Sequence, residues 1–524
     1  MIGVVPWAVL LAVASAVPAP AAGPRVILST WLGGPGADAL TSAIIMLDGA
    51  SLVGGTVAVD QLKLLQPPRA IAGSGDGAII RISPTENEIL AIVRFIGAVA
   101  DLDIDADGSN YITGGFGTTR ISVRGQLVWT NSVGDKDSRV AAGPGGGAFV
   151  IAGNKLIPIN SRGHADEAWD IPGASLNDVA WDPQTRRVFV TGFVNKKGHK
   201  ENVQVAFVYA YEANGKQAWK AYGWSGVEVD DEGLRADTRG YRLAMGPADR
   251  KLYLAGESAG GNSIWTRQSQ DLKAKADLAK GDRYQQASNT AANPITFIGR
   301  LDAMTGKSEG GTMLLGRLPD DKASTMRPRA LAVDGDGRIY VGGTAASGAP
   351  ISEGAFGGRS EGGAFLVIFD ASFKRIYATT LCDGQTNAIA VAPSYVVAVG
   401  EGKGGLVAER PLQAQPGGDT DGWVVMLMRM GRMVPYLPLP PPAKPPASPA
   451  PGPAAPAKPP AAPAPAPGPA APAKPPAAPT PTPAPAAPAK SPAASAPAPG
   501  PAPPAKPPAS STPAPGPAAP APGR

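Results

Sequence analysis

The segment that decides the fold is residues 101–114, which read DLDIDADGSNYITG. An alternating run, Asp-Leu-Asp-Ile, and an apolar run, Tyr-Ile-Thr, flank a turn that is rich in Asp, Gly and Asn, and the second run ends in glycine. Turns of this composition supply the positive φ angles that tight hairpins need. Alternating or wholly apolar flanks are typical of strands buried between two sheets. The segment therefore predicts a β-hairpin.

The same pattern recurs along the chain and gives seven copies in all. The other six copies are residues 43–55, 140–153, 178–192, 243–256, 330–343 and 388–400. A second hairpin pattern follows most copies, at residues 119–129, 207–219, 297–306 and 365–377. Two hairpins make four strands, which is one propeller blade. The repeats thus predict an all-β, seven-bladed β-propeller.

The N-terminal segment 26–32, VILSTWL, has the character of an outer blade strand but has no blade of its own before it. It leads into the first repeat as residues 376–381 lead into the seventh. We therefore expect residues 26–32 to complete the last blade. Closure of this kind joins the first and last repeats and removes an exposed sheet edge.

Several of these residues resemble a known family. The runs STWLGG at 29–34, ALAVDGDGRIYVGG at 330–343 and GAF at 354–356 are similar to the bacterial seven-bladed β-propeller repeat. The likeness spans about residues 26–430 and is clearest in the first and sixth repeats. The resemblance implies a propeller fold and secretion, and it implies little about chemistry.

The two ends of the chain differ from the repeat region. Residues 4–17 are almost all apolar and end in small residues, so we expect 1–22 to be a signal peptide and the protein to be exported to the periplasm, cell surface or medium. No later segment is apolar for long enough to predict a transmembrane helix. The propeller is expected over 23–435.

Residues 436–524 form a Pro/Ala/Lys-rich tail that contains no Asp or Glu. Such a composition cannot bury a core, so we expect it to be disordered and extended. The six Lys and Arg of this tail more than account for the net charge of +5, which leaves the remaining chain near neutral. A near-neutral fold argues against a nucleic-acid partner.

Residues 260–293 interrupt the fifth repeat and are polar and charged. We expect a short helix over 271–280, with Gly281 as its C-cap. A long insertion can serve as a binding loop, and aromatic and amide side chains together suit sugars or peptides. The candidate ligand-binding residues are Trp265, Arg267, Arg283, Tyr284 and Asn289.

No catalytic motif stands out, and the single cysteine, Cys382, is expected to be a buried structural thiol. The sequence predicts no cofactor, and calcium is the one ion that its acidic residues could suit. Asp103, Asp105 and Asp107 begin like a calcium loop, but Gly114 stands where an EF-hand needs Glu. A second acidic group consists of Glu228, Asp230, Asp231 and Glu232.

These observations favour an exported binding or scaffold protein at the bacterial cell envelope, with a glycan or a secreted protein as its ligand. Two alternatives stay open. One is a secreted polysaccharide lyase or hydrolase with its site in the propeller channel, since glycoside hydrolysis needs only two carboxylates. The other is a structural component of a surface assembly.

Overall fold

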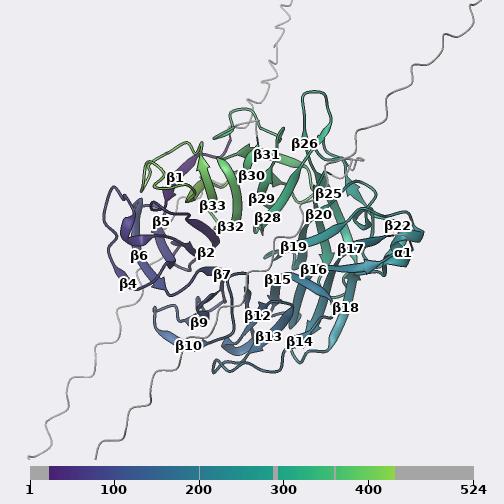
Figure 1. The fold of residues 1–524 in the computed structure, drawn as a ribbon, viewed down its shortest axis with the longest axis horizontal. Coiled ribbons are helices and arrows are strands. Elements are labelled where there is room, and N and C mark those ends of the chain that lie inside the picture. The colour runs from purple at the N-terminus through teal and green to yellow at the C-terminus, as the bar shows by residue number, and fades with distance from the viewer. Residues whose placement is uncertain (1–22, 200, 287–292, 359–361, 431–524) are drawn as a thin grey trace, which may run out of the picture. The chain divides into compact units, whose positions relative to one another are not determined.

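The computed structural model describes residues 23–199, 201–286, 293–358 and 362–430. Within these residues, seven sheets of four or five strands stand around a common centre as the blades of a propeller (Figure 1). Each blade begins with the strand nearest the centre and continues outward. The predicted all-β, seven-bladed fold is thus confirmed. The expected signal peptide and Pro/Ala-rich tail lie outside the described residues.

From the centre to the outer edge, sheet order follows chain order except at the outermost strands of blades 1, 5 and 7. Blade 1 consists of β2 (Ala39–Ile45), β3 (Ser51–Thr56), β5 (Gly77–Ser83), β6 (Glu88–Phe95) and β4 (Ile71–Gly73). Blade 2 consists of β7 (Val99–Ile104), β8 (Asn110–Gly114), β9 (Gly117–Ile121) and β10 (Leu127–Asn131). Blade 3 consists of β11 (Arg139–Ala142), β12 (Ala148–Ala152), β13 (Lys155–Ile159) and β14 (Trp169–Asp170). Blade 4 consists of β15 (Ala174–Asp182), β16 (Arg187–Lys197), β17 (Asn202–Glu212) and β18 (Gln217–Tyr222). Blade 5 consists of β19 (Thr238–Met245), β20 (Lys251–Ser258), β24 (Ile295–Asp302), β25 (Ser308–Leu314) and β23 (Leu278–Ala279). Blade 6 consists of β28 (Met326–Val333), β29 (Ile339–Ala345), β30 (Gly363–Phe369) and β31 (Arg375–Thr380). Blade 7 is β32 (Asp383–Val391), β33 (Tyr395–Gly404), β34 (Asp421–Met428) and β1 (Val26–Leu32).

Short elements outside the blades complete the described fold. Two strand pairs are β21 (Arg267–Gln268) with β22 (Asp271–Lys275), and β26 (Gly316–Arg317) with β27 (Ala323–Ser324). The helical turns are η1 (Val59–Gln61), η2 (Pro144–Gly146), η3 (Ile264–Thr266) and α1 (Gly226–Asp231). None of the helices in the described ranges has the length and apolar character needed to cross a membrane.

The N-terminal strand closes the ring as the sequence predicts. β1 pairs antiparallel with β34, from Val26 opposite Leu427 to Leu32 opposite Gly422. Leu32 is fully buried in the apolar cluster between blades 7 and 1. The first and last parts of the described chain are therefore held by main-chain hydrogen bonds and by a shared core.

The turn of the repeat hairpin is built around one aspartate. In blade 2, Asp105 accepts hydrogen bonds from the backbone N–H groups of Asp107 (3.0 Å) and Ser109 (3.1 Å), and from the Tyr111 hydroxyl (2.9 Å). Asp334 makes the equivalent three bonds in blade 6, where its hydroxyl donor is Tyr340 (2.9 Å). Because the same arrangement recurs in two blades, Asp105 is accounted for as a turn residue.

The prediction of a helix over 271–280 is wrong. Asp271–Lys275 is strand β22, which pairs with β21, and Leu278–Ala279 is strand β23, which pairs in parallel with β25 at the edge of blade 5. The Ala, Leu and Lys residues of this segment favour helices. Their alternating exposure instead suits a strand, and pairing with blade 5 outweighs the local preference.

Candidate functional site

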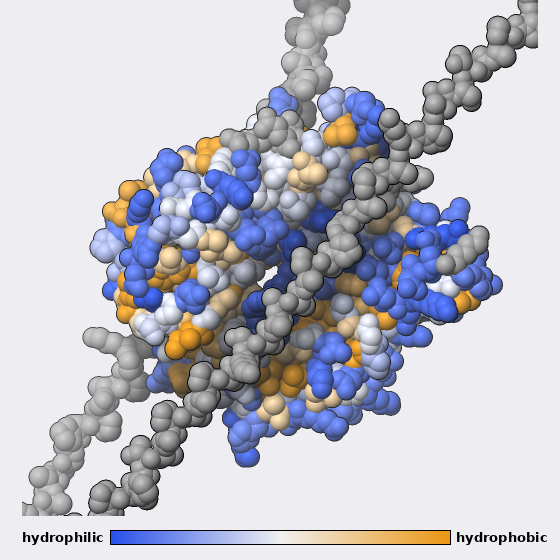
Figure 2. Space-filling model, in the orientation of Figure 1, coloured by the Kyte–Doolittle hydropathy of each residue, from blue (hydrophilic) through white to orange (hydrophobic). Residues whose placement is uncertain are grey.

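A channel runs through the centre of the ring, and residues of all seven inner strands line it. Its cavity volume is about 290 Å³. At the end where the inner strands begin, a polar mouth of about 420 Å³ adjoins it and shares Thr41, Arg139, Arg242 and Asn387 with it. Figure 2 shows the opening near the centre of the ring, with strongly hydrophilic residues beside it. The mouth is in the size range of small-molecule sites.

The mouth is shaped by β-bulges. In the described chain, six inner strands shift register by one residue at the same height, and β11 is the strand that does not. A bulge re-aims the inserted side chain. The six inserted residues all line the mouth, and they are Thr41, Ala100, Asn177, Tyr241, Arg329 and Asn387.

Some of the bulge residues join one blade to the next. The Thr41 hydroxyl donates to the carbonyl of Val99 in blade 2 (2.8 Å). Asn177 donates from its amide to the Gly240 carbonyl in blade 5 (2.7 Å). Asn387 in the last blade donates to Leu40 in the first blade (3.0 Å). In each case the acceptor precedes the bulge of the next blade, so a short polar bulge residue acts as a link between blades.

The residue that follows each bulge forms a second ring inside the channel. The register places Ser42, Asp101, Arg139, Asp178, Arg242, Ala330 and Ala388 at equivalent positions in blades 1 to 7. Blades 2 to 5 thus present Asp, Arg, Asp and Arg in turn.

The short members of this second ring also link neighbouring blades. The inner strand is a sheet edge, and its free N–H groups need acceptors. The N–H of Leu102 is accepted by Ser42 Oγ (2.9 Å), that of Val140 by Asp101 Oδ2 (3.1 Å), and that of Leu243 by Asp178 Oδ2 (2.8 Å). Asp101, Asp178 and Ser42 are therefore structural links.

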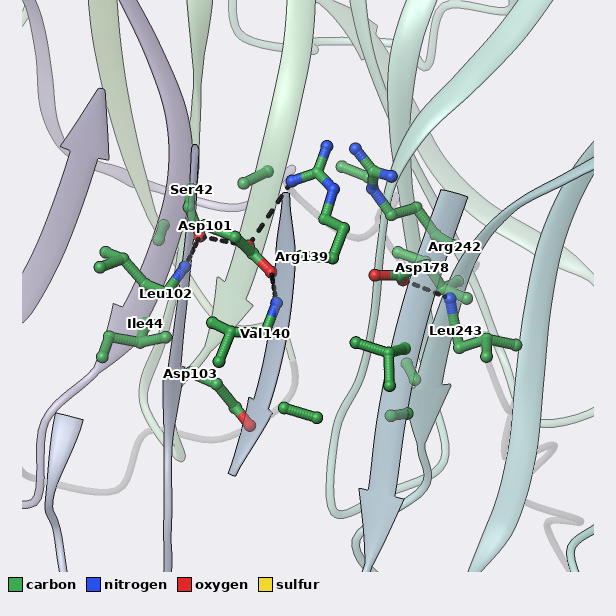
Figure 3. Close-up of a pocket in the computed structure, with 18 of the residues that line it drawn as sticks. Ser42, Ile44, Asp101, Leu102, Asp103, Arg139, Val140, Asp178, Arg242 and Leu243 are labelled. Atoms are coloured by element: carbon green, nitrogen blue, oxygen red, sulfur yellow. Dashed lines mark hydrogen bonds and ion pairs between the residues drawn. The ribbon is translucent and has the colours of Figure 1, made fainter. Parts of the chain in front are cut away.

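On one side of the mouth, arginine occupies positions in both the bulge ring and the second ring. Arg139 and Arg242 occupy the second ring, where a guanidinium cannot accept the N–H of the next blade. Tyr241 and Arg329 occupy bulge positions, which in three other blades carry a residue that links to the next blade. Figure 3 shows the guanidinium groups of Arg139 and Arg242 side by side, on the mouth side of the carboxylates of Asp101 and Asp178. Departures from a repeated structural rule are expected at functional sites.

These arginines have few negative partners. Arg139 lies 3.6 Å from Asp101. Arg242 donates to the carbonyls of Tyr241 (2.9 Å) and Asn177 (3.3 Å), and no ion pair to a carboxylate is found for it among the described residues. Exposed Arg329 has neither an ion pair nor a side-chain hydrogen bond within the same ranges. The lining of the mouth carries Lys136, Arg139, Arg242 and Arg329 against Asp137 and Glu401, so it has an excess of positive charge.

Burial and like charge shift the protonation of the channel groups. Burial, together with the nearby Arg139 guanidinium, lowers the pKa of Arg242 to about 10, so it stays cationic at neutral pH. Burial raises the pKa of Asp178 to about 6, although Arg242 and Arg139 oppose the change. Burial likewise raises the pKa of Asp103 to about 7, although its carboxylate accepts the Ala142 N–H (2.6 Å). Near neutrality Asp103 is therefore only partly ionised, whereas Asp178 stays largely ionised.

The predicted binding residues of the insertion do not gather at one exposed site. Trp265 is fully buried, stacks on Phe297 with ring centroids 4.5 Å apart, and donates to the Glu257 carbonyl (2.9 Å). Arg267 is largely buried, and its guanidinium lies 3.9 Å from Glu232.

The other members lie elsewhere in the insertion. Arg283 pairs with Asp321 (2.7 Å) and lies over the half-buried ring of Tyr284, at 5.4 Å. Asn289 lies outside the described residues. Only Arg283 and Tyr284 are thus brought together, away from the channel mouth.

The acidic candidates for calcium each have protein partners. Glu228 caps helix α1 by accepting from the Ser225 N–H (2.8 Å). Asp230 accepts from Arg235 (2.7 Å), and Asp231 lies 2.9 Å from His199 Nε2. Asp107 accepts from the Ser109 N–H (2.7 Å). In the part of the chain that the structure describes, no three His, Cys, Asp or Glu residues are placed to hold a metal ion.

Sequence reasoning missed the channel arginines because they belong to no local motif. The signal that could find them is the register of the repeats. When the seven hairpins are aligned on their second strands, Arg139 and Arg242 fall in the column that holds Ser42, Asp101 and Asp178. Charged residues that alternate in sign along one column of this alignment indicate a ring of charges around the propeller axis.

No protein-family model matches the chain, and no curated protein matches it. Among solved structures, the fold is similar to that of hydrazine synthase from Kuenenia stuttgartiensis, with a TM-score of 0.43 and 11% identity. That match covers 70% of this chain and 92% of the other. What the described chain itself establishes is a seven-bladed β-propeller.

Proposed function

We propose that this protein is an exported, non-enzymatic binding protein at the bacterial cell envelope and that it belongs to the bacterial seven-bladed β-propeller repeat family. Its ligand is a glycan or a secreted protein, and the ligand enters the polar mouth of the channel. The apolar N-terminal segment 4–17 supports export. The repeat residues 29–34, 330–343 and 354–356 support the family assignment.

One observation carries the choice of site. At the mouth, short polar residues of the two rings link one blade to the next, whereas Arg139, Arg242 and Arg329 place guanidinium groups there and Tyr241 places a phenol ring there. Uncompensated, partly buried charge costs stability. A group of such residues in a polar cavity of about 420 Å³ is therefore best explained by a ligand that they bind.

Calorimetric titration of the full chain with envelope polysaccharides and secreted proteins tests the proposal. We expect saturable binding that is lost when Tyr241 is replaced by Ala. The matched control is Tyr284→Ala, an aromatic truncation in the insertion, which should leave binding intact. If Tyr284→Ala abolished binding and Tyr241→Ala did not, the ligand site would lie at the insertion.

A lyase or hydrolase acting in the channel is the second candidate. It is favoured by the pKa of Asp178, which burial raises to about 6, because a carboxylic acid in this range can donate a proton near neutral pH. Against it, Asp178 already serves as the acceptor of the Leu243 N–H. Analysis of the same polysaccharides after incubation for shortened or unsaturated products decides between binding and turnover.

A further inference from the structure

The charges at the mouth define the kind of group that the ligand must carry. Four cations line the mouth, and one of them, Lys136, pairs with Asp137 at 2.6 Å. Within the described residues, no carboxylate lies within ion-pair distance of Arg242 or Arg329, although Asp178 and Asp101 act on Arg242 electrostatically, and Arg139 lies 3.6 Å from Asp101.

We infer that Arg139, Arg242 and Arg329 bind an oxyanion carried by a glycan, such as a uronate carboxylate or a sulfate ester. This inference rests on the proposed binding site at the mouth and specifies its ligand. A guanidinium presents several N–H donors in one plane and binds carboxylate, sulfate or phosphate oxygens in pairs. Three guanidinium groups in a confined mouth can surround one such group.

The rest of the mouth suits the sugar that would carry the anion. The side-chain amides of Asn177 and Asn387 already donate to backbone carbonyls, which leaves their oxygens as acceptors directed by those bonds. Gln385 is held in the same way, because its amide donates to Glu401 (2.6 Å). Fixed acceptors beside the ring of Tyr241 match the hydroxyl groups and faces of a sugar.

Depth in the channel explains why three arginines are needed. Arg329 is exposed at the rim, whereas Arg139 keeps one fifth of its side-chain area exposed and Arg242 is half-buried. An entering anion would meet Arg329 first and then the pair at the base. The carboxylates of Asp101 and Asp178 lie below the guanidinium groups in Figure 3 and accept N–H groups of the next blade, so they leave the mouth side open.

The test titrates the full chain with three trisaccharide probes of equal length: trigalacturonate, a sulfated neutral trisaccharide and the unmodified neutral trisaccharide. We expect one of the two anionic probes to bind at least tenfold more tightly than the neutral one, with affinity that falls as salt rises. Which anion binds more tightly identifies the oxyanion as a carboxylate or a sulfate.

Two substitutions separate a built site from general charge attraction. Arg329→Ala should weaken binding of the preferred anionic probe by about tenfold, the usual effect of losing one charge-assisted hydrogen bond. Arg124→Ala removes the same charge from the outermost hairpin of blade 2 and should change the affinity less than twofold. Arg242→Lys keeps the charge but lacks the planar, paired N–H donors of the guanidinium. This variant should bind more weakly while unfolding at the wild-type temperature.

Other outcomes overturn the inference in distinguishable ways. Equal binding of the neutral and anionic probes would refute the oxyanion inference and leave the binding site at the mouth standing. Binding of a secreted protein but of no glycan would also refute it. Equal losses in Arg124→Ala and Arg329→Ala would show nonspecific attraction, and failure of every ligand to bind would remove the proposed function as well.

Discussion

Replacing Asp103 with asparagine should stabilise the protein near pH 8 and leave its stability unchanged near pH 4. Asp103 lines the channel, and its carboxylate accepts the N–H of Ala142 in the next blade. Burial raises the pKa of Asp103 from 3.8 to about 7. An asparagine oxygen can accept the same N–H without carrying the charge.

The size of the effect follows from linkage. Between pH 4 and pH 7 the folded protein binds the Asp103 proton more tightly than the unfolded chain does. Stability is therefore greatest below the unfolded pKa and falls as the pH rises through the folded pKa. One unit of pKa is worth about 1.4 kcal/mol, so a shift of about three units sets an upper limit of about 4 kcal/mol. Solvent in the channel screens the charge, and we expect a gain of about 1–3 kcal/mol near pH 8.

Urea unfolding of wild type and Asp103→Asn at several pH values measures this gain. The control is Asp107→Asn in the same hairpin. Asp105 and the Ser109 hydroxyl and N–H lower the pKa of Asp107 to about 2, so this substitution should not stabilise the protein at any pH. If Asp103→Asn lowered stability equally at pH 4 and pH 8, Asp103 would act as an ionised link between blades, and the burial argument would be refuted.

Three further predictions concern the core. Trp265→Ala should lower the free energy of unfolding by about 3–5 kcal/mol because the ring is fully buried against Phe297, whereas Arg283→Ala, which breaks an exposed ion pair, should change it by less than about 1 kcal/mol. Chemical denaturation of both variants measures the difference, and equal effects would contradict the burial of Trp265. Leu32→Ala in the closing strand should cost about 2–5 kcal/mol, and a cost no larger than that of exposed Val128→Ala would show that closure adds little. The Cys382 thiol, which is 1% exposed, should react with an aromatic disulfide reagent only at the rate of unfolding, and rapid stoichiometric reaction in the folded state would contradict its burial.

The fold could be predicted from the sequence because its signals are local and repeated. Residues such as Asp105 and Asp334 mark the hairpin turns at a fixed distance from the strands that they join. Seven repetitions of a weak signal make a strong one, and the unpaired strand at residues 26–32 then has one sheet edge left to pair with.

The site could not be predicted in the same way because it arises from long-range register. Arg139 and Arg242 are more than a hundred residues apart and share no motif, yet the ring places them side by side. The insertion misleads for the opposite reason. Trp265 stands in a polar segment whose composition predicts a ligand contact, but the segment folds back so that the ring packs on Phe297. Local composition does not determine which neighbours a segment meets.

Protection of an engineered thiol most directly tests whether the ligand enters at the mouth. Asp137→Cys places a reactive thiol on the exposed rim of the mouth, and Ala106→Cys places one at the far end of the channel, while the native cysteine is buried. The tightest-binding acidic trisaccharide at saturating concentration should slow maleimide modification of the cysteine at position 137 at least fivefold and leave that at position 106 unchanged. Protection at position 106 alone, or at neither position despite measured binding, would contradict a ligand site at the arginine-bearing mouth.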